Sequence, residues 1–503
     1  MPAHDAMSRL AELGLWVLVT LVLLGAVPLF AATYQFLLIG AHSWRNHYDD
    51  VGLYEPRVAI LVPAWNEAAV LEASIDRLVG LDYPRDRLRV YVVDDASTDA
   101  TPGVVQAKAR QYPGQVVHLR RETGGEGKAH TLNHGLRVIL AHDWMQALLI
   151  MDADVIYEPD SLRKMTRHLA DPKVGAVTAY IKEGSRPGNY LQRFIAYEYV
   201  TAQAAARRSQ NVLGALACLA GGAQLHSRAN LEALGGRIDT TSLAEDTFTT
   251  FDTQLAGHKV VFDGNATVWA EEPDAIAALW KQRLRWARGN VQVTRRYKHL
   301  WFRPAADHRL GSISFGVFWF SLFLLPVFMI VSSAALLTLY VVDVEQSWAV
   351  FRMLWISNAL TYLFITGFAL AIDPGTARRS WREAILFPGV VSLLIILYTC
   401  APRGFGWLVQ TWGELTGLTW TDTTTHVAML FAYAWIALCM PVAWLGKKTE
   451  ELGLRRLSPL FVYLAGYGPL LCAVTFASYL DEVRGAELSW EKTVKTGKVS
   501  LPR

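Results

Sequence analysis

The sequence has few cysteines and few charged residues for its length of 503 residues. Charged residues make up 18% and the net charge is +3, so bulk charge implies no polyanion-binding surface, and we expect no nucleic-acid partner. The cysteines form neither a disulfide framework nor a metal-ligand pattern, and three of the four lie inside apolar runs, which favours buried thiols. They are Cys218, Cys400, Cys439 and Cys472.

Patterns that would assign other functions are also missing. The histidines show no metal-ligand spacing, and there is no heptad repeat or nucleic-acid motif. The stretch GGEGK at 124–128 resembles a P-loop only superficially, because Glu122 stands at the position of the first glycine and Ala129 follows the lysine. Its glycines would still let the backbone approach a phosphate, with Lys128 adding positive charge near a helix N-terminus; the alternative is a flexible loop with a solvated lysine.

Long hydrophobic runs, in contrast, are abundant. Hydrophobic residues make up 52% of the chain and mean hydropathy is +0.21, values that predict membrane spans. Residues 13–40 carry no charge and are long enough to cross a bilayer, and the residues before them lack the basic bias of a signal peptide, so we expect an uncleaved anchor. Five further runs lie at 312–342, 353–372, 385–401, 427–446 and 459–480.

Loop charges predict how these runs are oriented. Residues 373–383 contain three arginines and residues 446–458 contain two lysines and two arginines, so the positive-inside bias places both loops in the cytoplasm, together with the soluble part. Counting then gives six spans with both termini outside. The last span stays open, because Gly466 and Pro469 can kink it or make it re-entrant.

Between residue 57 and about residue 300 the apolar runs shorten and charges return. Short apolar strands alternate there with segments of helical spacing, which predicts an α/β domain with a parallel sheet and helices on both faces. The strands lie at 58–65, 89–95, 116–120 and 147–154, and the helices at 68–80, 100–112 and 127–141. Two further strands are expected at 258–262 and 266–270, followed by a helix start at Pro273.

Acidic residues follow the strands of this domain, at the edge where ligands of such sheets bind. Asp152 and Asp154 come after an apolar strand, and two carboxylates in this arrangement can bind Mg²⁺ or Mn²⁺. Asp94 and Asp95 end another strand. The alternative for both pairs is turn and helix-cap chemistry.

A second cluster lies between 242 and 290. The acidic pair Glu245 and Asp246 precedes Gln282, Arg285 and Trp286, which helical spacing places on one face. Arg285 can bind a diphosphate through charge-assisted hydrogen bonds, and the ring of Trp286 can stack on a sugar. The competing interpretations are a helix cap for the acidic pair and an interfacial membrane helix for the Arg/Trp cluster.

The segments VPAWNE, VVDDASTD, GKAHTLN, DAD, AED and QRLRW, in this order, resemble the inverting family 2 glycosyltransferases, in particular their membrane-embedded processive branch of cellulose, hyaluronan, chitin and poly-N-acetylglucosamine synthases. The resemblance covers residues 57–290 and continues more weakly beyond. It implies a GT-A-like (Rossmann-like) cytosolic domain with a mostly parallel sheet, plus an α-helical transmembrane domain. The expected division is an N-terminal anchor (1–45), a glycosyltransferase domain (50–305), transmembrane helices (306–480) and a C-terminal tail (481–503).

The resemblance also implies a role for each motif residue. Asp246 is the expected catalytic base, and Asp152 and Asp154 the expected metal ligands. Donor contacts are expected from Pro63, Glu67, Asp94, Asp95, Lys128 and Asp152, and acceptor or diphosphate contacts from Glu245, Gln282, Arg285 and Trp286. The family often has threonine where this chain has Ala244. Cys218 and Gly221 fall in a segment that resembles an acceptor-site wall, and residues 489–499 resemble a cytoplasmic tail of related synthases.

The expected function is therefore that of a multi-pass enzyme of the cell inner (plasma) membrane with a cytoplasmic catalytic domain. It would transfer sugar from a nucleotide-sugar donor, UDP-GlcNAc or another UDP-hexose, to a growing β-linked polysaccharide acceptor and translocate the product. Two alternatives stay open: a nonprocessive transferase acting on a lipid-linked acceptor, and an inactive membrane subunit of a secretion complex. The lipid bilayer is an expected partner, and an accessory membrane subunit is left open.

Overall fold

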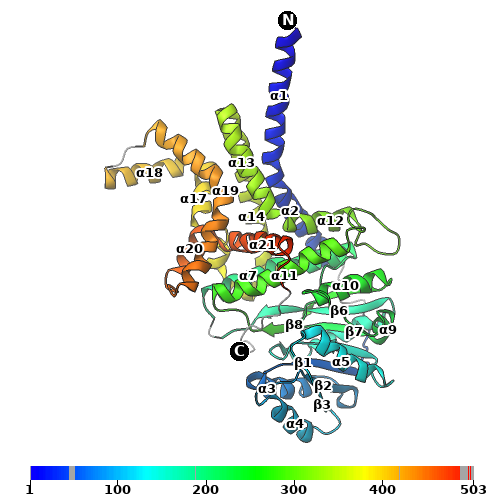
Figure 1. Cartoon of the computed structure of the whole chain (residues 1–503). Coiled ribbons are helices and arrows are strands. Elements are labelled where there is room, and N and C mark those ends of the chain that lie inside the picture. Colours follow the sequence, from blue (N-terminus) through cyan, green and yellow to red (C-terminus); the bar gives the residue numbers. More distant parts are fainter. Residues whose placement is uncertain are drawn as a thin grey trace. The chain divides into compact units, whose positions relative to one another are not determined.

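The computed structural model describes residues 2–44, 51–186, 188–417, 420–487, 497 and 499 (Figure 1). It divides into two compact units. One, here the sheet unit, contains Phe36–Gly316 and Gly485–Arg503; the other, the helical unit, contains Met1–Gln35 and Val317–Arg484.

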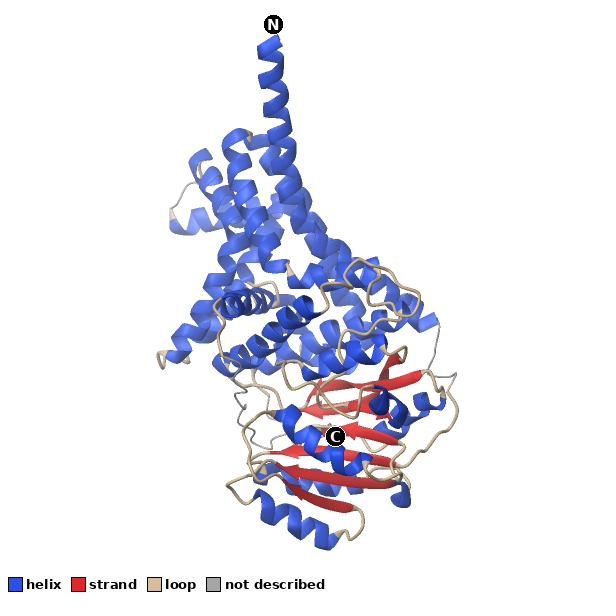
Figure 2. Ribbon diagram, turned by 45° about the vertical axis from the view of Figure 1, so that its right-hand side comes forward, coloured by secondary structure: helices blue, strands red, loops and turns tan. Residues whose placement is uncertain are grey.

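The sheet unit is built on one eight-stranded sheet in the order β3-β2-β1-β4-β7-β6-β8-β5 (Figure 2). Its first half is parallel, as predicted, and its second half is mixed, because β7 runs antiparallel to both neighbours and β5 antiparallel to β8. The first half contains β1 (Val58–Ala64), β2 (Leu88–Asp94), β3 (Val116–Arg120) and β4 (Ala147–Ile150). The second contains β5 (Ile156–Tyr157), β6 (Val174–Glu183), β7 (Gln224–Ser227) and β8 (Lys259–Ala270).

Helices cover both faces of the parallel half, because its central strands are apolar on both sides. Helix α5 (Lys128–Leu140) packs Leu132 and Leu136 against Ala59 and Leu61 of β1, all of them buried. Helices α3 (Ala68–Val79) and α4 (Thr101–Gln111) also contact β2, but none of their residues belongs to the cluster formed with α5. They cover the opposite face of the sheet. The three predicted helices are thus confirmed to within two residues at each end.

The prediction of two strands at 258–262 and 266–270 is wrong, because both belong to the single strand β8. The polar residues between them form a bulge instead of a turn: the Asp263 side chain accepts hydrogen bonds from the amides of Asn265 and Ala266, and the pairing register with β6 shifts there. Strand β4 ends at Ile150, so Asp152 and Asp154 follow it in a turn.

The remaining helices of the sheet unit bring the second cluster of motif residues toward the sheet. Helix α10 begins at Glu245, and α11 carries the Gln/Arg/Trp cluster and begins at Ile276, three residues after Pro273. The two pack closely, since a side chain at Gly289 of α11 would come within 2.5 Å of the Ala244 methyl group. Their bounds, with those of their neighbours, are α10 (Glu245–Leu255), α11 (Ile276–Arg296), α7 (Tyr190–Glu198), a π-helix (Tyr199–Ala205), α8 (Ala206–Leu213), α6 (Ser161–Thr166) and α9 (Arg228–Ala233).

The helical unit makes this a membrane protein. By length and composition, four stretches among the described residues can cross a bilayer: Arg9–Ser43 (helices α1, Pro2–Leu23, and α2, Val27–Trp44), α13 (Leu325–Val342), α14 (Val344–Ile372) and α19 (Asp422–Glu451). Two bent pairs raise the number to six if each counts as a span. They are α17 (Val390–Cys400) with α18 (Pro402–Thr416), bent by 116°, and α20 (Ser458–Ala465) with α21 (Tyr467–Val483), bent by 99°. Shorter helices are α12 (Ile313–Phe323), α15 (Pro374–Arg379) and α16 (Trp381–Leu386).

The backbones of two glycines lie in contact at the breaks of these helices. Gly389, before α17, has φ +86°, and Gly466, between α20 and α21, has φ +105°. A side chain on Gly466 would come within 2.5 Å of the Pro388 carbonyl carbon, and one on Gly389 would meet the backbone of Ala465 and Gly466. Only glycine allows the two backbones to touch in this way.

Candidate active site

A cavity of about 510 Å³ opens at the carboxyl ends of β1, β2 and β4. Every site residue expected from the sequence lines it except Asp94. The expected residues that line the cavity are Pro63, Glu67, Asp95, Lys128, Asp152, Asp154, Glu245, Asp246, Gln282, Arg285 and Trp286. Side chains separated by more than 200 positions along the chain are thus brought to one place, while their individual roles stay predictions.

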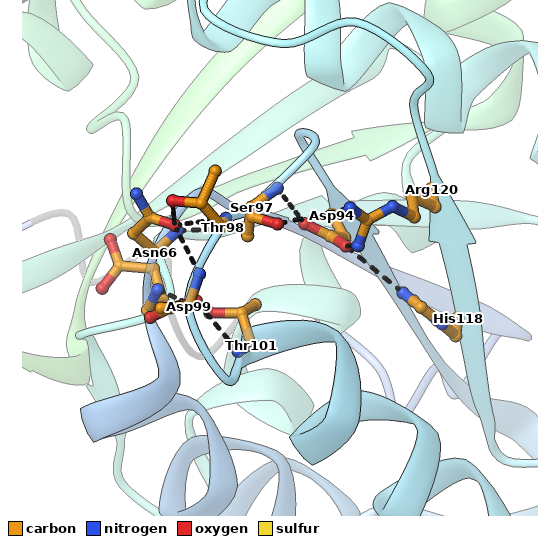
Figure 3. Close-up of polar contacts among 9 residues, drawn as sticks. Asn66, Asp94, Ser97, Thr98, Asp99, Thr101, His118 and Arg120 are labelled. Carbon is orange, nitrogen blue, oxygen red and sulfur yellow. Dashed lines mark hydrogen bonds and ion pairs between the residues drawn. The ribbon is translucent and has the colours of Figure 1, made fainter.

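Asp94 lies apart from the cavity in a buried polar network (Figure 3). Its carboxylate pairs with Arg120 at 2.5 Å and accepts a hydrogen bond from the Ser97 amide. Asn66, with φ +54°, accepts hydrogen bonds from the amides of Thr98 and Asp99. Asparagine tolerates this left-handed conformation better than most residues. The two motifs VPAWNE and VVDDASTD are therefore tied together by their own polar residues.

Asp95 reaches the cavity and also organises the glycine-rich loop. Its carboxylate pairs with Arg121 and accepts a hydrogen bond from the Gly125 amide at 3.1 Å. A side chain at Gly124 would collide with the Asp95 carbonyl oxygen. Close approach to Asp95 is thus the structural reason for Gly124, whereas Gly125 is favoured by its left-handed backbone conformation, with φ +89°.

The electrostatic centre of the cavity is Lys128, at the start of α5. Its ammonium group lies 2.5 Å from an Asp152 oxygen and 3.9 Å from one of Glu245, and donates to the Gly221 carbonyl at 3.1 Å. Burial alone would lower the pKa of Lys128, but the Asp152 and Glu245 carboxylates raise it above its usual value. Burial also raises the pKa of Glu245, with Asp246 adding to the effect and Lys128 opposing it.

Gly221 and Gly222 form the wall between the carboxylates. A side chain on Gly221 would lie 3.3 Å from the Asp246 Oδ2 atom, and one on Gly222 would lie 3.4 Å from the Asp152 Oδ2 atom. The other Asp246 oxygen, Oδ1, accepts from the Thr247 amide at 2.7 Å. Cys218 also lines the cavity, where burial and the Asp246 carboxylate raise the pKa of its thiol. Cys218 is half-buried and Cys400 is exposed, so the prediction of buried thiols is wrong for these two cysteines and confirmed for Cys439 and Cys472.

The residue that the sequence reasoning missed is Arg283, inside the QRLRW motif. Its side chain is 5% exposed; it donates to Glu198 at 2.9 Å and to the Gln282 side-chain oxygen at 2.7 Å. Its guanidinium also lies 4.1 Å from the centre of the Trp286 ring, a cation–π contact. Arg283 therefore holds two motif residues while lying outside the cavity lining.

Other polar residues of the cavity wall carry no motif signal. Tyr199 donates to Glu272 at 2.6 Å, and Gln282 donates to the same carboxylate at 3.4 Å. Arg207, after the π-helix, lines the cavity and bonds to Gln203 at 3.3 Å. Burial lowers the pKa of Arg207 and raises that of Tyr199. Only the fold brings these residues beside the acidic pair.

The chain resembles known proteins over this part. Residues 56–289 match the model described as glycosyltransferase like family 2. The probable glycosyltransferase YdaM of Bacillus subtilis is 30% identical over 327 residues, covering 64% of this chain and 75% of that protein. The β-monoglucosyldiacylglycerol synthase of Synechocystis sp. is 34% identical over 247 residues (49% and 50%), and the poly-β-1,6-N-acetyl-D-glucosamine synthase of Staphylococcus epidermidis is 26% identical over 237 residues (47% and 55%).

These matches define the class of the protein: the chain belongs to glycosyltransferase family 2 and is a glycosyltransferase. The expected fold class, a GT-A-like α/β domain with membrane helices, is confirmed. The chain spans about half the length of the Synechocystis and Staphylococcus relatives.

Proposed function

We propose that this enzyme transfers a hexose from a UDP-sugar to a growing β-linked polysaccharide and passes the product through its own membrane helices. The observation that carries the proposal is the single cavity in which Asp95, Asp154 and Asp246 lie together with Arg285 and Trp286. Similarity to poly-β-1,6-N-acetyl-D-glucosamine synthases makes UDP-GlcNAc the first donor to test.

Asp246 is the proposed base. The acceptor hydroxyl oxygen attacks the anomeric carbon and forms the new glycosidic bond while the bond from that carbon to the diphosphate breaks. The hydroxyl proton passes to the Asp246 carboxylate, the electron pair leaves with UDP, and the configuration inverts. Because Asp246 Oδ1 is held by the Thr247 amide, Oδ2, beside Gly221, is the oxygen proposed to take the proton.

The departing diphosphate is the proposed ligand of Lys128 and Arg285. Lys128 is kept protonated by its acidic neighbours, and a guanidinium binds phosphate oxygens through paired hydrogen bonds. Trp286 is the proposed platform for a sugar ring, with Gln282 and Glu245 beside it. Pro63, Glu67 and Asp95 are proposed to contact the nucleoside. Asp94, predicted as a donor contact, does not line the cavity, because its buried carboxylate is bound to Arg120.

Asp152 and Asp154 fit a Mg²⁺ or Mn²⁺ ion. Both are hard oxygen donors, and Asp152 already attracts the Lys128 ammonium group. Within the described part of the chain no cluster of three or more His, Cys, Asp or Glu residues could hold a metal, so these two carboxylates would share the ion with diphosphate oxygens and water, an arrangement common for Mg²⁺. Such an ion would neutralise charge on the leaving group.

A single transfer onto a lipid is the second candidate function. It is favoured by the similarity to the β-monoglucosyldiacylglycerol synthase, which is 34% identical over 247 residues. For either function we propose that the enzyme lies in the cell inner (plasma) membrane with its catalytic domain in the cytoplasm, because the basic loops 373–383 and 446–458 favour that side. An accessory membrane subunit stays a prediction.

Purified enzyme in nanodiscs, given Mg²⁺ or Mn²⁺ and each of UDP-GlcNAc, UDP-Glc, UDP-GlcA and GDP-Man in labelled form, separates the candidates. A long polymer supports the proposed function, and a lipid carrying one sugar supports the second. Asp246→Asn is the matched control. Transfer that is equal in the variant and the parent would rule out the proposed base.

A further inference from the structure

We propose that the two bent helix pairs differ in their relation to the bilayer, so that the chain crosses it five times. In this proposal α17 crosses, α18 lies flat among the lipid headgroups of the outer leaflet, and α20–α21 enters and leaves on the cytoplasmic side. The proposal rests on membrane location alone and is independent of the proposed reaction.

The crossing of α17 follows from contacts inside the helical unit. Helix α13 begins next to the sheet unit in sequence and ends at Val342, so we call the end at Val342 the far end. Trp348, four residues into α14, contacts the ring of Tyr398, two residues before the end of α17, with ring centroids 5.0 Å apart. Arg352 of α14 likewise donates to the Thr399 carbonyl. Helix α14 therefore runs away from the far end, and the chain returns to the far end along α17.

Helix α19 starts at the same end. His426, in its first turns, shares a hydrogen bond of 2.8 Å with Tyr340, two residues before the end of α13. Helix α18 thus joins two points that both lie at the far end. Helices α16 and α17 contain 6 and 11 residues, which together provide roughly 26 Å at about 1.5 Å per residue, and the non-helical residues 387–389 join them. The segment 381–400 is therefore close in length to the thickness of the hydrocarbon core.

The pair α20–α21 begins and ends at the opposite, near end. It follows α19, which returns from the far end. At its other end the Tyr479 hydroxyl donates to the Phe323 carbonyl, and the rings of these residues lie 5.3 Å apart. Phe323 is two residues before the start of α13, so α21 finishes at the near end, where α13 begins. In Figure 1, α21 lies across the direction of α13.

The C-terminal residues give an independent check on whether the number of membrane crossings is even or odd. The carbonyls of Ala486 and Glu487 accept hydrogen bonds from Arg288, the Gly497 amide donates to Glu271, and Val499 packs on Trp269. All of these residues belong to the sheet unit. The chain therefore crosses an even number of times between Gly316 and Gly485. Helices α13, α14 and α19 supply three crossings, so one bent pair crosses and the other does not.

The surface of α18 suits a lipid interface. None of its described residues is buried. Trp407, Trp412 and Leu415 are 65%, 63% and 78% exposed, while Gln410 and Glu414 are hydrogen-bonded to each other. Tryptophan is enriched at membrane interfaces, and an amphipathic helix places its apolar side in the headgroup boundary. Its connection to α17 at the far end assigns it to the outer leaflet.

Cysteine accessibility in the full-length enzyme tests the crossings. In a background with Cys218→Ser and Cys400→Ser, which removes the two cysteines that are not buried, one cysteine at a time is added at the exposed positions Thr423, Leu454 and Ala486. Each variant is then treated with a membrane-impermeant maleimide. We expect Thr423→Cys to be labelled in intact cells, and Leu454→Cys and Ala486→Cys only after permeabilisation. Labelling of Ala486→Cys in intact cells would mean that α20–α21 crosses, and protection of Thr423→Cys there would mean that α17 does not; either result overturns the proposal.

Brominated lipids test α18 separately. Phospholipids brominated near the headgroup should quench less tryptophan fluorescence in a Trp407→Phe/Trp412→Phe variant than in the parent enzyme. Trp144→Phe, in the sheet unit, is the control and should leave the amount of quenched fluorescence unchanged. Equal quenching of the double variant and the parent would show that this face of α18 does not lie in lipid.

Discussion

Arg283 offers the sharpest test of how the QRLRW segment is held. In Arg283→Met the side-chain volume is nearly kept, but the guanidinium is lost. Glu198, whose side chain is 11% exposed, then keeps its negative charge in a buried place without this cation. Breaking a buried pair from one side costs about 3–5 kcal/mol, and losing the contact with Trp286 costs a further ~1 kcal/mol. At about 2–4 °C per kcal/mol, this total of about 4–6 kcal/mol should lower the melting temperature by roughly 8–24 °C.

A double variant separates stability from positioning. Glu198→Gln/Arg283→Met removes both charges, so most of the lost stability should return, as it does when buried pairs are replaced by neutral residues. Transfer should not return, because Gln282 and Trp286 still lack the group that holds them. Thermal unfolding in detergent and kcat/KM for the best donor measure the two effects. Full recovery of both in the double variant would refute the positioning role and leave Arg283 as a purely structural residue.

The remaining predictions concern four other positions. Asp246→Asn should abolish transfer while UDP-sugar binding, measured by calorimetry, is kept; loss of binding would instead mark Asp246 as a donor contact. Arg285→Ala should weaken product inhibition by UDP at least tenfold, since it removes charge-assisted bonds worth about 1.5–3 kcal/mol; an unchanged inhibition constant contradicts the diphosphate contact. Burial lowers the pKa of His226 to about 4, so as the pH falls the unfolded chain protonates this histidine before the folded chain does. The contribution of His226 to the free energy of unfolding is complete above pH ~6.5 and should fall by ~3 kcal/mol as the pH drops toward 4. A His226→Gln variant should flatten this part of the plot of unfolding free energy against pH. Gly466→Ala should cost at least ~2 kcal/mol, because its φ is positive and the added carbon meets Pro388; an unchanged melting temperature would show that the helix break is not tightly packed.

The parallel half of the sheet could be predicted from sequence because its signal is local. Val58–Ala64 and Leu88–Asp94 are apolar runs, and each is followed by polar turn residues and a helix. The bulge at Asp263 could not be predicted, since a strand interrupted by Asp-Gly-Asn has the same pattern as a hairpin. Asp94 and Asp95 are adjacent and chemically alike, and only the pairing of Asp94 with Arg120 distinguishes the buried carboxylate from the one at the cavity.

The site was accessible to sequence reasoning only where a motif marks it. Arg283 occupies a variable position of QxxRW, so nothing in the motif separates it from a surface arginine. Its partner Glu198 lies 85 positions earlier, on a helix without any motif, and the pairing exists only in the folded chain. The same holds for Tyr199, in the π-helix, and Arg207, in α8, which both line the cavity.

The contact between Gly389 and Gly466 has a practical consequence for shortening the protein. A gene ending before Ser458 would delete the backbone that lies against Gly389, and would leave an interrupted helix next to lipid tails, which offer no partner to its amide and carbonyl groups. The segment from Ser458 onward therefore cannot be trimmed to obtain a smaller enzyme for reconstitution. Minimal versions should be designed by shortening loops instead.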